Sequence, residues 1–263
     1  MKIIKPSIGG HGGCSFRELL DMWVERGFCE VEKGPQQRSK GYNEDPDSPE
    51  AKCWIEKQGG ILLYDFPILD RLKNEYEMCL FANTYKEGEK NKKWIFWPKH
   101  SRLYEENKKE LRNSVKKYNC GFIGSPTNYS RNSIAGYWSQ KCDLFHLGHN
   151  IPHEHYLQYC SQFTFGLCLP GVGPKCLRDI EYMGMGVIPI IVDKNAVDLY
   201  YDPPVENEHY IFVQDIDEMT SKIDDLLCNE SNIRSMSEAC IEWFNKNCSV
   251  EGSFKTTMEI INE

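Results

Sequence analysis

The sequence predicts an α/β fold, because the order strand, glycine turn and helix occurs twice in it. In the second occurrence, the apolar run at residues 163–169 suits a buried strand, and Gly171 and Gly173 break the run with a turn. Residues 174–184 then carry apolar side chains at helical spacing, and the β-branched run at residues 187–192 predicts another strand. Strands that alternate with helices are typical of a parallel sheet whose faces are covered by helices.

The first occurrence lies at the N-terminus. Residues 2–8 suit a short strand, the glycine-rich residues 9–13 suit a turn, and a helix is expected to begin near Ser15. Residues 34–50 are polar and rich in Pro, Gly, Asn and Asp, which predicts a loop. Such a loop could cover a binding site, as lids do.

The remaining elements follow from shorter apolar runs and from helical spacing of apolar side chains. Strands are expected at residues 53–55, 61–64, 78–82, 94–97, 120–124, 143–148 and 211–213. Helices are expected at residues 68–76, 101–117, 153–161, 216–228, 232–247 and 253–261, and residues 125–138 should form a loop that runs into a helix. We place a domain boundary near Lys117, between an N-terminal α/β domain of residues 1–117 and a C-terminal α/β domain of residues 118–263. The last helix is expected to cross back onto the first domain.

Length and composition indicate a globular protein with a real core. A chain of 263 residues buries roughly three quarters of its extended surface on folding, and 40% hydrophobic with 27% charged residues is ordinary for a soluble protein. The net charge of −8 argues against a nucleic-acid partner. No apolar run approaches the ~20 residues that span a bilayer, and the N-terminus lacks the apolar core of a secretory signal. We therefore expect a cytoplasmic protein with no membrane span.

Metal-ligating side chains are present without the spacing of a metal site. The twelve cysteines include no CxxC pair, and we interpret them as mostly reduced core thiols. His149, His153 and His155 have the right ligand type, but no cysteine pair or HExxH helix accompanies them, so no metal is expected. Asp215 and Asp217 follow an expected strand, and we interpret this pair as a turn or a helix cap.

The turn at Gly171 and Gly173 has the features of an anion site. It directs a helix N-terminus and free backbone N–H groups toward whatever lies above the strand ends, and this arrangement favours a phosphate. Arg178 adds a permanent charge with fork geometry, and Glu181 can accept hydrogen bonds from a pair of sugar hydroxyls. On the pattern alone, plain packing of the strand–helix–strand unit accounts for these residues equally well.

The order of residues in this stretch resembles the C-terminal half of the exostosin-like glycosyltransferases. That family has a strand ending in Cys-x-Pro, a Gly-x-Gly turn, an Arg-x-x-Glu helix and a Gly-x-Ile-Pro-Val-type strand. The matching residues here are Cys168, Pro170, Gly171, Gly173, Arg178, Glu181, Gly186, Ile188, Pro189 and Ile190. The similarity extends over roughly residues 119–213. It implies a GT-B fold, in which two Rossmann-like domains face each other across a cleft.

The resemblance also implies an activity, namely inverting transfer of a sugar from a UDP-sugar to a saccharide hydroxyl without a divalent metal. UDP-xylose is one candidate donor among other UDP-sugars. No cofactor is expected, and the partners would be the donor and an oligosaccharide or glycoprotein acceptor. Family members are usually membrane-anchored in the Golgi lumen, so this chain departs from them or is trimmed. The alternatives are a GDP-sugar transferase similar to the fucosyltransferases and a non-catalytic protein that binds sugar nucleotides.

Glycosyl transfer requires groups that stabilise the leaving diphosphate and position the donor. We assign the diphosphate to Arg178 and to the backbone of Gly171, Val172 and Gly173. Glu181 is expected to bind the ribose, with a solvated glutamate as the alternative.

Arg131 is a candidate second phosphate ligand. It lies just beyond the strand expected to end at Gly124 and close to Ser125 and Thr127, and exostosin-like proteins often carry an arginine after this strand. A surface arginine is the alternative interpretation.

The catalytic base should come from the N-terminal domain, and two candidates remain open. Asp65 ends the apolar run 61–64, where a carboxylate either faces an active cleft or caps the next helix. His11 lies in the expected glycine turn and has a side chain suited to proton transfer. Trp94 and Trp97 could belong to a stacking platform for an acceptor sugar, or they could be core residues.

Overall fold

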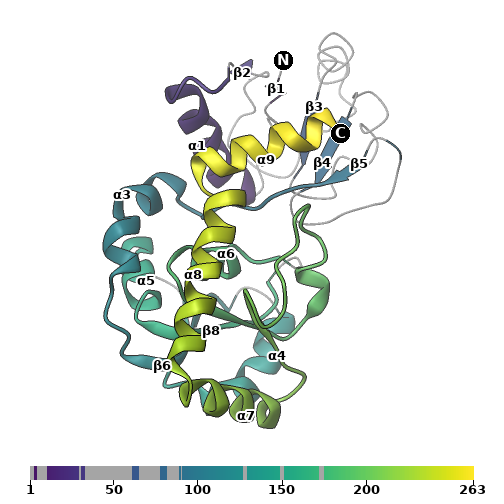
Figure 1. Ribbon diagram of the computed structural model, residues 1–263. Coiled ribbons are helices and arrows are strands. Elements are labelled where there is room, and N and C mark those ends of the chain that lie inside the picture. Colours follow the sequence, from purple (N-terminus) through teal and green to yellow (C-terminus); the bar gives the residue numbers. More distant parts are fainter. Residues whose placement is uncertain are drawn as a thin grey trace.

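The computed structural model describes residues 3–4, 11–29, 31–32, 61–64, 78–81, 89, 91–126, 129–148, 151–171 and 175–263 (Figure 1). Only the backbone is described for residues 3–4, 11–17, 31–32, 61–64, 78–79, 81, 91 and 129–130. The described residues form two parallel five-stranded sheets with helices packed around them. The expectation of an α/β fold is confirmed.

The first sheet has the strand order β2-β1-β3-β4-β5, and all its pairings are parallel. Its strands are β1 (Ile3–Ile4), β2 (Val31–Glu32), β3 (Ile61–Tyr64), β4 (Met78–Phe81) and β5 (Asn91–Lys93). Helix α1 (His11–Glu25) connects β1 to β2. The expected elements at residues 53–55 and 68–76 lie outside the described residues.

Two expectations for this region are wrong. The helix begins at His11 and not near Ser15, so part of the expected glycine turn is helical. A glycine inside a helix costs only about 1 kcal/mol relative to alanine, which the rest of the helix can offset. The strand expected at residues 94–97 is replaced by β5 directly before it. All four side chains of residues 94–97 are buried in the core. A continuous run of large apolar residues is also typical of a buried strand, and for that reason the sequence predicted one here.

The second sheet has the order β10-β9-β8-β6-β7 and is also parallel. Its strands are β6 (Tyr118–Gly124), β7 (Leu144–Leu147), β8 (Phe163–Cys168), β9 (Ile188–Ile191) and β10 (Ile211–Phe212). Its helices are α4 (Tyr129–Trp138), α5 (His153–Cys160), α6 (Leu177–Gly184) and α7 (Ile216–Leu227). The chain moves from β6 outward to β7 and then returns past β6 to β8. The carboxyl ends of β6 and β8 therefore form a topological switch point, the place where open α/β sheets bind ligands.

Helix α6 begins later than expected. Its N-cap is Cys176 and its first residue is Leu177, whereas Pro174, the expected first residue, lies outside the described residues. The helix ends at Gly184, and Gly186 follows with a φ of 67°, a left-handed conformation that favours glycine. Asp215 caps α7 by accepting hydrogen bonds from the N–H groups of Asp217 and Glu218, which confirms the cap interpretation.

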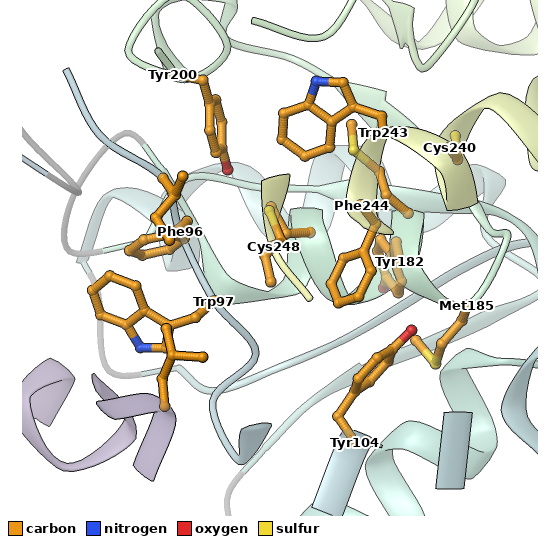
Figure 2. Close-up of a cluster of buried hydrophobic side chains, with 14 of the residues drawn as sticks. Phe96, Trp97, Tyr104, Tyr182, Met185, Tyr200, Cys240, Trp243, Phe244 and Cys248 are labelled. Carbon is orange, nitrogen blue, oxygen red and sulfur yellow. The ribbon is translucent and has the colours of Figure 1, made fainter. Parts of the chain in front are cut away.

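A large aromatic cluster fills the space between the two sheets. It combines the segment after β5 with α3 (Ser101–Arg112), α6, α8 (Glu230–Asn247) and α9 (Val250–Asn262). Figure 2 shows Phe96 and Trp97 from the first part of the chain with Tyr182 and Phe244 from the second. Trp94 and Trp97 are fully buried here, so they are core residues and cannot serve as a platform for a sugar.

Helix α9 packs against α1, at the other end of the sequence (Figure 1). The Trp23 Nε1–H donates to the Val250 carbonyl at 2.9 Å and to Ser253 Oγ at 3.1 Å. The Trp94 Nε1–H donates to Thr257 Oγ1 at 2.8 Å. Among the described helices, none is long and apolar enough to cross a bilayer.

Candidate functional site

Arg131 of α4 reaches the switch point and joins the ends of β6 and β8. Its Nη1 donates to the Ser125 carbonyl at 2.9 Å, on the β6 side. Its Nε and Nη2 donate to the carbonyls of Pro170 and Leu169 at 3.1 and 3.4 Å, on the β8 side. The side chain is buried, so Arg131 is not the surface arginine of the alternative interpretation.

Arg178 of α6 also reaches the carboxyl end of β6. Its Nε donates to the Ile123 carbonyl at 2.9 Å, and its guanidinium carbon lies 4.4 Å from the centre of the Phe122 ring. Its Nη1 is buried and has no hydrogen-bond partner among the described residues. Gly124 makes room for this side chain, because a Cβ there would lie 2.6 Å from Arg178 Nη2.

Buried cations outnumber buried carboxylates among the described residues. Of the described residues, the buried charged side chains are three cations and two carboxylates: Arg131, Lys175, Arg178, Asp179 and Glu181. Burial lowers the pKa of Arg131, and the positive charge of Arg178 lowers it further. Two guanidinium groups that repel each other in a buried setting would be stabilised by an added anion.

Lys175 is a member of this group that the sequence reasoning did not consider. Its Nζ donates to the Trp94 carbonyl at 3.2 Å and lies 3.9 Å from the centre of the Tyr200 ring. The side chain is 2% exposed. The sequence offered one signal for including Lys175 among the site residues. Lys175 lies directly between the glycine turn and α6, and the start of a helix after such a turn often binds phosphate.

Asp179 occupies the N-terminus of α6, where the sequence predicted an open anion site. Its Oδ2 accepts a hydrogen bond from the Cys176 N–H at 3.2 Å and so caps the helix. A carboxylate at this position already satisfies the helix dipole and repels a second anion. The assignment of the diphosphate to the backbone of Gly171, Val172 and Gly173 stays a prediction, because Val172 and Gly173 lie outside the described residues. Burial raises the pKa of Asp179 to about 6.

Glu181 faces the protein interior and not solvent, contrary to the expectation for a ribose ligand. Its Oε1 accepts a hydrogen bond from the Lys99 N–H at 2.9 Å, and its Oε2 accepts one from the Tyr156 hydroxyl at 2.9 Å. His153 Nε2 lies 3.4 Å from Oε1. Burial alone would raise the pKa of Glu181, but His153 and the hydrogen bonds leave it lowered. The carboxylate thus fastens the segment between β5 and α3 to α5 and α6.

The other expected site residues are described in part or not at all. Ser125 and Gly171 lie half-buried at the ends of β6 and β8. The backbone of His11 begins α1, and its side chain is not described. Thr127, Val172, Gly173 and Asp65 lie outside the described residues. Among the residues that are described, no three His, Cys, Asp or Glu side chains gather as a metal site.

Comparisons with known proteins add little. No protein-family model matches the chain, and no curated protein matches it. One solved structure similar to it is the C-terminal domain of a glycosyl transferase group 1 family protein from Francisella tularensis. The identity is 11%, the match covers 57% of this chain and 94% of that domain, and the TM-score is 0.37. At that score the similarity supports neither a shared fold nor a shared function.

Proposed function

We propose that the chain is a glycosyltransferase that binds the diphosphate of a nucleotide sugar at the carboxyl ends of β6 and β8. The observation that carries this proposal is the meeting of Arg131 and Arg178 at the switch point, with Arg178 Nη1 buried and without a partner among the described residues. The sequence pattern around both arginines resembles that of the exostosin-like family, and this resemblance indicates that the phosphate belongs to a nucleotide sugar.

A diphosphate would match this site electrostatically. It would accept a charge-assisted hydrogen bond from Arg178 Nη1 and offset the repulsion between the two guanidinium groups. The same groups would stabilise the negative charge that develops on the diphosphate as it leaves the sugar. Arg131 also holds both strand ends together, so the ligand would bind to a rigid frame.

The finer parts of the proposal come from the resemblance. The donor is a UDP-sugar, with UDP-xylose a candidate, and the sugar passes with inversion to a saccharide hydroxyl. The base is Asp65 or His11, on the part of the chain that carries the first sheet, and the two sheets belong to facing domains of a GT-B enzyme. The diphosphate is bound without a divalent metal.

Substitution of Arg178 by methionine tests the proposal. Methionine fills a similar volume without charge, and replacing a buried ionic group by an apolar one is often tolerated by the fold. We expect the affinity for UDP, measured by calorimetry, to fall by roughly 10- to 100-fold, the size of a lost charge-assisted hydrogen bond. Circular dichroism checks that the variant is folded.

Arg112→Met is the matched control. Arg112 of α3 also donates to a backbone carbonyl, that of Gly184, at 2.9 Å, but it does so at the C-terminal end of α6. Its replacement should leave UDP affinity unchanged. If Arg178→Met binds UDP and GDP as tightly as the wild type does, the proposed site is wrong.

Two further variants test the catalytic base. If Asp65→Asn and His11→Ala both retain turnover, neither residue is the base. If the wild type binds the donor but shows no turnover, the protein is non-catalytic.

A further inference from the structure

Two cysteines lie in contact near the start of the second sheet. Cys120 is the third residue of β6, and Cys142 lies two residues before β7, the strand that pairs with β6. Both are free thiols, and their sulfur atoms are 3.7 Å apart. The sulfur atoms of a disulfide are about 2.05 Å apart, so an approach of roughly 1.6 Å would bring these two within bonding distance.

Hydrogen bonds hold the backbone around both cysteines. The Asp143 N–H donates to the Cys120 carbonyl at 2.9 Å, and the Cys142 N–H donates to the Ser139 carbonyl at 3.3 Å. Asp143 Oδ2 accepts from the N–H groups of Asn119 and Cys120 at 2.6 and 3.2 Å. Because these bonds tie the start of β6 to the segment before β7, the two thiols stay together for as long as the strands are paired.

The two thiols differ in their access to solvent. Cys142 is partly exposed, whereas Cys120 is 2% exposed. A hydrogen bond with Cys142 raises the pKa of the Cys120 thiol well above its ordinary value, and burial raises it further. Since the thiolate is the reactive form, a reagent in solvent reaches Cys142 first, and Cys120 lies behind it as a protected thiol.

We propose that Cys120 and Cys142 are an oxidisable dithiol, which hydrogen peroxide converts to a disulfide. In the first step the Cys142 sulfur attacks one peroxide oxygen, the O–O bond breaks and water leaves, so that Cys142 becomes a sulfenic acid. In the second step the Cys120 sulfur attacks the Cys142 sulfur, the S–O bond breaks, and the hydroxyl leaves as water with the proton of the Cys120 thiol. The two thiols together lose two electrons, and the peroxide is reduced to two molecules of water.

The disulfide would join β6 to the end of α4. Cys142 Sγ lies 3.7 Å from the carbonyl oxygen of Trp138, the last residue of α4. The new bond would span 22 residues of the chain and restrict the unfolded state, so the disulfide form should unfold at a temperature several degrees higher than the reduced form. Arg131 and Arg178 bind at the other end of β6, and the inference therefore does not depend on the proposed function.

Peptide mapping by mass spectrometry tests the proposal. The reduced full-length chain is treated with a small excess of hydrogen peroxide, blocked with N-ethylmaleimide and digested with trypsin without a reductant. We expect peptides 118–131 and 142–175 as one species, two hydrogens lighter than their sum. Peptide 142–175 also contains Cys160 and Cys168, so fragment ions must assign the link to Cys142. Dithiothreitol should separate the peptides again.

Two variants test the assigned roles of the thiols. In Cys120→Ser the reaction should stop at the sulfenic acid of Cys142, which dimedone labels. In Cys142→Ser the buried Cys120 should remain a thiol. Cys228→Ser is the matched control, because it removes an exposed thiol at the end of α7, and it should form the link between Cys120 and Cys142 as fully as the wild type.

The mapping uses the wild type, so its result does not depend on the stability of a variant. If Cys142 does not react, or if it becomes a sulfenic acid without a link to Cys120, the proposal is wrong. A link that forms as fully in urea as in the native protein would show that the fold does not hold the pair, and the proposal would again fail. A disulfide form that unfolds at a lower temperature than the reduced form would contradict the position of the two sulfur atoms. Dimedone labelling of Cys120 in Cys142→Ser would overturn the assigned roles.

Discussion

Glu181 illustrates how the neighbours of a residue decide its role. An Arg-x-x-Glu spacing places Arg178 and Glu181 one turn apart, and the sequence could predict that much. It could not predict that the Lys99 N–H and the Tyr156 hydroxyl would converge on the carboxylate, because these groups come from segments 82 and 25 residues away. Arg131 was easier to place, because it follows a strand whose end borders the strand before Arg178. The helices that carry Arg131, Arg178 and Glu181 could be predicted from the sequence, whereas the partners of these side chains depend on long-range packing.

Replacing Glu181 by glutamine should weaken the fold. The amide keeps the size of the side chain but must turn an NH₂ group toward one of two donors, the Lys99 N–H or the Tyr156 hydroxyl. We expect the free energy of unfolding to fall by roughly 2–3 kcal/mol, measured by urea denaturation at neutral pH. Glu218→Gln is the control, since Glu218 forms a half-exposed pair with Lys222, and the substitution should cost less than about 1 kcal/mol. Equal losses in the two variants would contradict this account of Glu181.

Asp179 should make the fold less stable as the pH rises through the mildly acidic range. Its pKa is raised from 3.8 to about 6 in the folded protein, chiefly by burial. Between about pH 4 and pH 6 the unfolded chain releases the proton while the folded chain retains it, so stability from this residue is lost as the pH rises. Relative to the wild type, Asp179→Asn should gain on the order of 2 kcal/mol between pH 4 and pH 7. A stability difference that stays constant across this range would show that the pKa is not raised.

At the scale of elements, the sequence predicts the strands and helices whose pattern of apolar residues is set by local contacts. The apolar runs of β3, β8 and β9 and the periodic pattern of α7 have this property, and their bounds agree with the structure to within about two residues. The segment 94–97 was misjudged because a run of aromatic residues has the same signal in an interior strand and in an irregular core segment. Strand β2 has two residues, too few for any periodicity to show.

The junction between α8 and α9 depends on a glycine. A Cβ at Gly252 would overlap the backbone carbonyl oxygens of Asn245 and Lys246, and backbone atoms cannot move aside as a side chain can. Gly252→Ala should therefore destabilise the protein by several kcal/mol, about the size of a badly overpacked core site. Thermal denaturation followed by circular dichroism measures the effect.

Gly136→Ala is the control for that substitution. Gly136 lies in α4 and is exposed, and a Cβ there would meet no atom within 4 Å. Its replacement should stabilise the protein by roughly 0.5–1 kcal/mol, because alanine restricts the unfolded chain and favours a helix. If Gly252→Ala were as harmless as Gly136→Ala, the close crossing of α8 and α9 would be wrong.

At the scale of the whole molecule, α9 connects the ends of the chain. It packs against α1 and receives the hydrogen bond of Trp94, while α8, directly before it, packs against α6 and β9 (Figure 1). The aromatic cluster extends without a break from Leu19 and Trp23 to Trp243 and Phe244. The described parts of the two sheets therefore share one core, and they should unfold together and not as separate units.

Thr257→Val tests this cooperativity. Trp94 and Thr257 are fully buried, so the variant removes the Thr257 acceptor of the Trp94 Nε1–H and should cost roughly 1–3 kcal/mol. Because the core is shared, tryptophan fluorescence and far-ultraviolet circular dichroism should report one transition, displaced equally for both probes. Thr220→Val is the control, since the Thr220 hydroxyl also donates to the carbonyl four residues earlier but lies on α7, away from the shared core. It should leave the midpoint almost unchanged. Two separate transitions, of which Thr257→Val shifts only one, would show that the sheets are independent and that α9 does not join them.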